Sequence, residues 1–124
     1  MNIPKSSYID LGPLKEEVEG NTVICKMLIN SFIKDIDSYV NTMTNEIQAT
    51  DFTGLYHVAH KIIPSLRIFR VEKLEPVMLE LEKDLRGLNN LEEIKTKIYF
   101  SLKVFSQVKV ELQNEIIRID DAAT

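Results

Sequence analysis

The residues best suited to chemistry in this sequence are two histidines, His57 and His60, and a lone cysteine, Cys25. A neutral imidazole is a competent nitrogen nucleophile and can also bind a metal ion. The two histidines lie three residues apart, which suits two metal ligands on one helix face, but no Asp or Glu nearby on that face completes a ligand set. We therefore expect no metal site. Cys25 lies beside Ile24 and near Leu28, with no histidine in its helix, so we interpret it as a semi-buried packing thiol.

The elements that must position these residues follow from the spacing of apolar side chains, which is helical throughout the chain. No window shows the sustained alternation of apolar and polar residues that a strand needs. The spacing predicts four long amphipathic helices and one short helix before them, over residues 21–48, 50–69, 72–86, 89–117 and 11–18.

Connections of about two to six residues favour antiparallel neighbours. We therefore predict a single all-α domain over residues 1–124, with its core over about 8–117. Its architecture is expected to be an antiparallel up-down-up-down four-helix bundle with a short N-terminal helix. Asn21 or Thr22 suits an N-cap, and Pro76 is tolerable if it lies in a first helical turn. Met27, Met43 and Met78 lie on the apolar stripes and are expected in the core, and residues 120–124 are expected to form a solvated tail.

The second long helix has the most regular stripe, so its other residues can be placed by turning about 100° per residue. His60 lies roughly 130° and His57 roughly 170° from the centre of the stripe, so both should face solvent. The residues predicted to share the exposed side with His60 are Thr53, Tyr56, Ile63, Pro64 and Arg67. Ile63 and Pro64 are apolar where a bundle helix normally carries polar residues, which indicates a docking surface. Pro64 also removes a helix amide and should kink the helix at His60.

Composition excludes several classes of function. The 124 residues are 44% hydrophobic and 27% charged, with a net charge of −4. Acidic and basic residues are interspersed, so no basic stripe is available to bind nucleic acid. No stretch approaches the run of about 20 apolar residues that crosses a bilayer, and the N-terminus has no signal-peptide pattern. The chain also lacks a P-loop or other nucleotide fingerprint. We expect a cytoplasmic monomer that neither binds ATP nor acts as an enzyme by itself.

The segment around His60 resembles the histidine phosphotransfer (HPt) domain family. That family's pattern is alanine-histidine-x-leucine-lysine-glycine-serine, followed by a spaced leucine and a leucine-glutamate signature. The matching run here spans residues 59–66 (Ala-His-Lys-Ile-Ile-Pro-Ser-Leu) and continues through Leu74, Leu81 and Glu82. The resemblance covers about residues 8–117 and implies a helical bundle of the predicted kind.

The resemblance implies that His60 is the phosphoacceptor and that Ser65 matches the motif. The sequence departs from the family at three positions. The family's lysine is Ile63, its following glycine is Pro64, and its later glycine at the helix-helix turn is Arg70. A cation could instead come from Arg67, which projects within about 20° of His60 two turns away, or from Lys61, at about 100°. The expected docking residues are Tyr56, Ile63, Pro64 and Ser65, with Arg67 beside them.

The resemblance also implies the partners: response-regulator receiver domains and, upstream, a hybrid histidine kinase. The receiver would bring the aspartyl phosphate and Mg²⁺, so this chain needs no cofactor of its own. The phosphoryl group would pass from Asp to His60 and on to another Asp. Two other functions stay open: an HPt-like module that docks receivers without accepting phosphate, and a helical interaction protein unrelated to phosphorelays.

Overall fold

The described residues of the chain form five α-helices. The computed structural model describes residues 7–47, 52–87 and 90–123, and no strand occurs in those ranges. The helices, in chain order, are α1 (Gly12–Glu17), α2 (Thr22–Glu46), α3 (Thr53–Ile68), α4 (Glu75–Gly87) and α5 (Leu91–Ala123). The all-α prediction is confirmed. None of the described helices is both long and apolar enough to cross a membrane.

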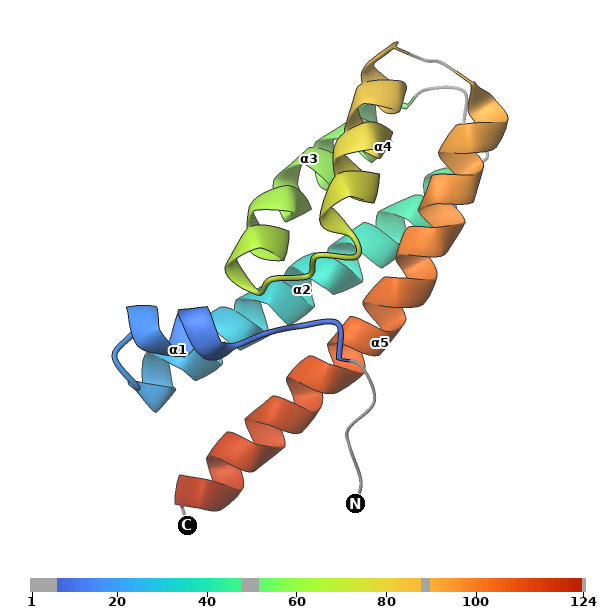
Figure 1. The fold of residues 1–124 in the computed structure, drawn as a ribbon. Helices are drawn as coiled ribbons and strands as arrows, with labels where there is room; N and C mark the ends of the chain where they lie inside the picture. Colours follow the sequence, from blue (N-terminus) through green and yellow to red (C-terminus); the bar gives the residue numbers. More distant parts are fainter. Residues whose placement is uncertain (1–6, 48–51, 88–89, 124) are drawn as a thin grey trace, which may run out of the picture.

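The four long helices contact one another in a ring. Helix α2 packs against α3 and α5, and α4 packs against the same two neighbours. Figure 1 shows α3 and α4 side by side over one half of the bundle, with α5 extending well past them towards α1. Because every long helix has two neighbours, each must bury a broad apolar face rather than a single row.

A continuous hydrophobic core fills the ring. Its fully buried members include, from the four long helices, Phe32, Ile36, Tyr39, Met43, Leu55, Ile62, Leu66, Met78, Leu81, Ile98, Phe105, Val108 and Leu112. Within it the hydroxyls of Tyr39 and Ser101 are 2.6 Å apart, and the Ser101 hydroxyl donates to the carbonyl of Ile98 at 2.7 Å. Burial raises the pKa of Tyr39, so this phenol stays protonated and can keep its hydrogen bond.

The methionine predictions are partly correct. Met43 and Met78 are buried as expected, but Met27 is 64% exposed. The inward positions of the first turns of α2 are Cys25 and Ile29. Met27 lies about 200° around the helix from Cys25 and therefore points outwards. Cys25 was expected to be a semi-buried packing thiol; it is buried, at 3% exposure, and burial raises its pKa.

The helix boundaries follow local signals with two corrections. Asn21 caps α2, since its side-chain oxygen accepts from the amide of Ile24 at 3.0 Å, and Gly20 before it has φ +74°. Pro76 falls in the first turn of α4, where a proline is tolerated because the amides there have no helical acceptor. That helix begins at Glu75 rather than near residue 72.

The second correction concerns the C-terminal end, which was expected to be a solvated tail from residue 120. Helix α5 instead continues to Ala123. Half-buried Ile119 packs against the core, and Asp120 pairs with Lys26 of α2 at 2.6 Å. These contacts extend the helix past its predicted end.

Carboxylates of α5 hold the N-terminal segment. The Glu111 carboxylate accepts hydrogen bonds from the Ser7 hydroxyl and from the amides of Tyr8 and Ile9, at 2.7 to 3.2 Å. One turn later, Glu115 pairs with Lys15 of α1 at 3.1 Å. Two α5 carboxylates therefore replace the broad apolar contact that a helix as short as α1 cannot make.

We expect Met78→Ala and Met27→Ala to differ sharply in stability. The substitutions are chemically identical and both lie in helices, but Met78 is fully buried and Met27 is largely exposed. Truncating Met78 should lower the free energy of unfolding by about 2–5 kcal/mol, and truncating Met27 by less than about 0.5 kcal/mol. Urea denaturation of the two variants and the parent measures this difference. Equal losses would contradict the placement of α2.

The Glu115 contact should make stability depend on pH. Burial alone would raise the pKa of Glu115, but hydrogen bonds from Arg118 and Lys15 outweigh it and lower the pKa. A lowered folded-state pKa contributes stability above the unfolded value near 4.5, and this is lost as the pH falls through the folded value.

Glu115→Gln should therefore be less stable than the parent at neutral pH, by about 1–2 kcal/mol. The difference should shrink in acid, where the parent carboxylate is protonated as well. Urea titrations at neutral pH and at acidic pH compare the two proteins. A difference that stays constant with pH would contradict the ionic role of Glu115.

Candidate functional site

The candidate site lies on α3, whose inward face is set by Leu55, Ala59, Ile62 and Leu66. Those four side chains are at most 1% exposed, so the rotation of the helix is well determined. His60 consequently points outwards, with a side chain that is 64% exposed. His57 is exposed too, and the prediction that both histidines face solvent is confirmed for both.

The turn that ends α3 contains Arg70 in a backbone conformation that favours glycine. Arg70 has φ +56°, in the left-handed region that favours glycine, and the amide of Val71 bonds back to the carbonyl of Leu66 at 2.8 Å. The HPt pattern that the sequence resembles has a glycine at this position, where the sequence has arginine. Arg70 adopts the conformation that the turn requires, at the steric cost that a side chain adds.

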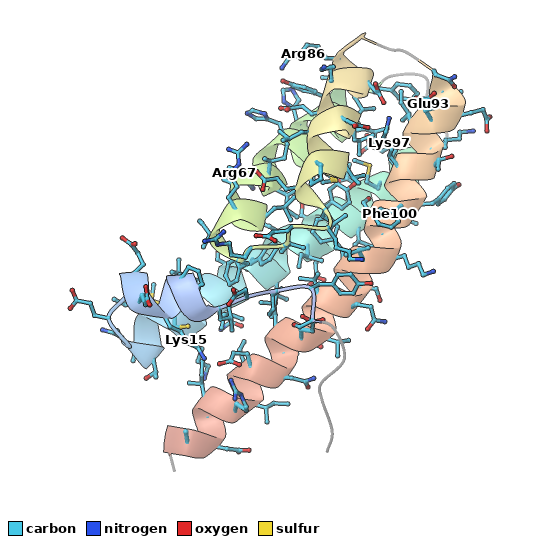
Figure 2. All side chains as sticks on the ribbon, viewed as in Figure 1. Lys15, Arg67, Arg86, Glu93, Lys97 and Phe100 are labelled. Carbon is cyan, nitrogen blue, oxygen red and sulfur yellow. The ribbon has the colours of Figure 1, made fainter. Side chains whose placement is uncertain are left out.

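Three side-chain pairs link α3 to α4 on the exposed side. We call them the α3–α4 ladder: Arg67–Glu75, His60–Glu82 and Tyr56–Arg86. From one pair to the next, the residue number falls by seven and then four on α3 and rises by seven and then four on α4. The two helices therefore run in opposite directions over this stretch. Figure 2 labels Arg67 and Arg86, which mark the two ends of the ladder.

The central pair orients the imidazole. Nδ1 of His60 forms a hydrogen bond with the Glu82 carboxylate, whose side chain is only 15% exposed. An ionised carboxylate can only accept, so Nδ1 must be the donor. Nε2 is then the ring nitrogen that carries the lone pair when the ring is neutral. The site thus holds an exposed imidazole in one tautomer.

Tyr56 and Arg86 flank the imidazole on one side. The ring of Tyr56 stacks on that of His60, with centroids 5.9 Å apart and planes 14° from parallel. Arg86 donates to the Tyr56 hydroxyl at 3.0 Å, and its guanidinium lies 5.5 Å from the centre of the Tyr56 ring. The hydrogen bond that Arg86 donates to Tyr56 raises the pKa of Arg86, which therefore stays charged. An aromatic ring separates this cation from His60.

Arg67, expected to neutralise phosphate, is already engaged. Its Nε donates to Glu75 at 2.6 Å, although the side chain is 58% exposed. Lys61, the other expected cation, is exposed and has no ion-pair partner within the described ranges. The freer of the two predicted cations is thus the one less well aligned with His60.

The docking residues were only partly well placed. Pro64 is exposed, and Tyr56 and Ser65 are half-buried. Ile63, however, is 5% exposed and belongs to the core, so its predicted outward position is wrong. Helix α3 packs on both α2 and α4, and the second contact widens its buried face beyond the stripe seen in the sequence.

Glu82 and Arg86 were the site residues that sequence reasoning missed. The sequence pattern included Glu82 only as part of the leucine-glutamate signature, and it gave Arg86 no role in the site. Both lie on one face of α4 with Glu75, at spacings of seven and four residues, which a helical wheel can reveal. The missing information was the register of α4 against α3.

Metal binding gains no support from the arrangement. Over the ranges that the structure describes, no group of three or more His, Cys, Asp and Glu side chains is placed to hold a metal ion.

Comparisons of the chain with family models, with curated proteins and with solved structures find no match. The site must therefore be interpreted from its own geometry.

Replacing Glu82 with Leu should release the imidazole of His60. Without the carboxylate acceptor, the neutral ring can exchange between its two tautomers. ¹⁵N chemical shifts recorded at alkaline pH should show Nδ1 protonated and Nε2 unprotonated in the parent, and averaged values in the variant. His57, which lies on the same helix, is the internal control. Identical His60 shifts in both proteins would contradict the orienting role of Glu82.

Proposed function

We propose that the chain is an HPt-like phosphorelay carrier. In this proposal His60 accepts a phosphoryl group from the aspartyl phosphate of a receiver domain and passes it to another receiver. The observation that carries the proposal is the exposed His60 ring with Nδ1 bound to Glu82. That arrangement reserves Nε2 as a nucleophile and leaves it accessible to a macromolecular donor.

The geometry supports a simple transfer step. The Nε2 lone pair forms a bond to phosphorus, the bond from phosphorus to the aspartate oxygen breaks, and the aspartate leaves with that electron pair. No proton has to be removed, so no general base is needed. Positive charge develops on the imidazole, and the Glu82 carboxylate beside Nδ1 stabilises it. Positioning and charge stabilisation account for most of the catalysis in phosphoryl transfer.

The segment that forms α3 and α4 is less acidic than the rest of the chain, which supports binding of an anionic group there. Residues 53–87 carry six basic and five acidic side chains, a net of +1, whereas the whole chain carries −4 and the remainder therefore −5. Lys61 is the cation proposed to meet the phosphoryl group, with Arg67 available only if it leaves Glu75. Mg²⁺ would arrive with the receiver, and a hybrid histidine kinase would supply the phosphate upstream.

We further propose that the ring of helices is an antiparallel up-down-up-down four-helix bundle. The reversed order of the α3–α4 ladder supports this for one pair. Ion pairs between α2 and α5 support it for another, since Lys26 pairs with Asp120 and Asp37 with Lys109. A rigid bundle of this kind would present His60 on a fixed face to each partner that docks there.

A docking module that binds receivers without accepting phosphate is the second candidate. The pairing of Arg67 with Glu75 and the negative charge of Glu82 beside the imidazole favour it, because both reduce the attraction for a phosphoryl group. Both candidates use the same face of the bundle. They differ only in whether a covalent bond to His60 forms.

Exposure to receivers carrying a radiolabelled aspartyl phosphate separates the two candidates. A panel of receiver domains from the same genome should include one that transfers label to the chain, giving an acid-labile and base-stable product. The label should vanish in His60→Gln and persist in the matched variant His57→Gln. Receiver binding without any label would establish the docking module, and no binding to any receiver would refute both.

A further inference from the structure

Pro64 creates an unusual backbone feature beside His60. It lies inside α3, is exposed, and is followed by another turn of helix that ends at Ile68. Each helix amide normally donates to the carbonyl four residues earlier, and proline has no amide hydrogen. The carbonyl of His60 therefore lacks its helical donor, and no side chain in the described ranges donates to it.

This free carbonyl lies at the candidate site. His60, Lys61 and Pro64 are all exposed, so the solvent side of this turn is open. A proline within a helix is costly, and the cost falls here within one turn of the proposed nucleophile. Water can satisfy the carbonyl in the free protein, and a docked partner must replace that water with a donor of its own.

We infer that the carbonyl oxygen of His60, freed by Pro64, is a recognition point that accepts a hydrogen bond from the partner domain docking over His60. The inference deepens the proposed function, because it takes that partner to be a receiver. It applies equally to the carrier and to the docking module. Pro64 thus becomes a specificity residue that acts through the carbonyl of His60 and not through its own ring.

The charges nearby indicate the kind of donor. Lys61 follows His60 directly and has no ion-pair partner within the described ranges, and Arg67 and Arg86 stand at the two ends of the ladder. These three cations outnumber the two carboxylates of the ladder, Glu75 and Glu82, so the face disfavours an incoming ammonium or guanidinium. The partner group is therefore a neutral donor, either a backbone amide or a hydroxyl.

Pro64→Ala tests the inference, because it restores the amide and lets the carbonyl bond within the helix. The variant should be more stable than the parent, with a higher urea midpoint, yet bind the receiver about three- to tenfold more weakly. The affinity ratio between parent and variant should be the same at low and high salt, since neutral groups interact. An unchanged midpoint or an unchanged affinity would overturn the inference.

A backbone ester separates the carbonyl from the proline ring. Incorporating lactic acid at position 64 removes both the ring and the amide hydrogen, so the carbonyl of His60 stays free. This protein should bind the receiver as the parent does. If it binds as weakly as Pro64→Ala, the ring and not the carbonyl is recognised, and the inference fails.

Pro76→Ala is the matched control. Pro76 is exposed in the first turn of α4, where the amides need no helical acceptor, so the affinity should not change. Label transfer to His60 at saturating receiver tests the proposed function separately. If no label is transferred but Pro64→Ala binds the receiver more weakly, the carrier function is refuted and this inference stands. If label is transferred but Pro64→Ala and the parent bind with equal affinity, this inference is refuted and the carrier function stands.

Discussion

The hydrogen bond between His60 and Glu82 is the contact on which the proposed chemistry depends. It joins two helices, so it exists only when α3 and α4 hold their register, and it decides which nitrogen of the imidazole carries the lone pair. The flanking pairs, Arg67–Glu75 and Tyr56–Arg86, lie in the same register. The ladder thus connects the packing of the bundle with the orientation of a single ring.

Exposure at this site is a consequence of burial elsewhere. The apolar stripe of α3 must face inwards, and its most deeply buried members determine where every other residue on the helix points. His60 is therefore presented by the core rather than by a loop. A histidine held this way has a position that the packing of the whole helix determines.

The helices, the inward stripes and the exposure of both histidines could be predicted from spacing alone, because a helix repeats its contacts every three to four residues. Ile63 was misplaced because the wheel assumes one buried face, and α3 has two neighbours. Glu82 and Arg86 were missed for a different reason. Local periodicity says which way each helix faces but not how far one slides along another, and that offset decides which side chains meet.

Cys25 has a practical consequence for experiments on this protein. It is the sole thiol of the chain, it is buried at the start of α2, and its raised pKa keeps it in the unreactive protonated form. A cysteine introduced at an exposed position would therefore react with a fluorophore or spin label far faster than the native one. Distances between labelled helices could then be followed without first removing the natural residue from the core.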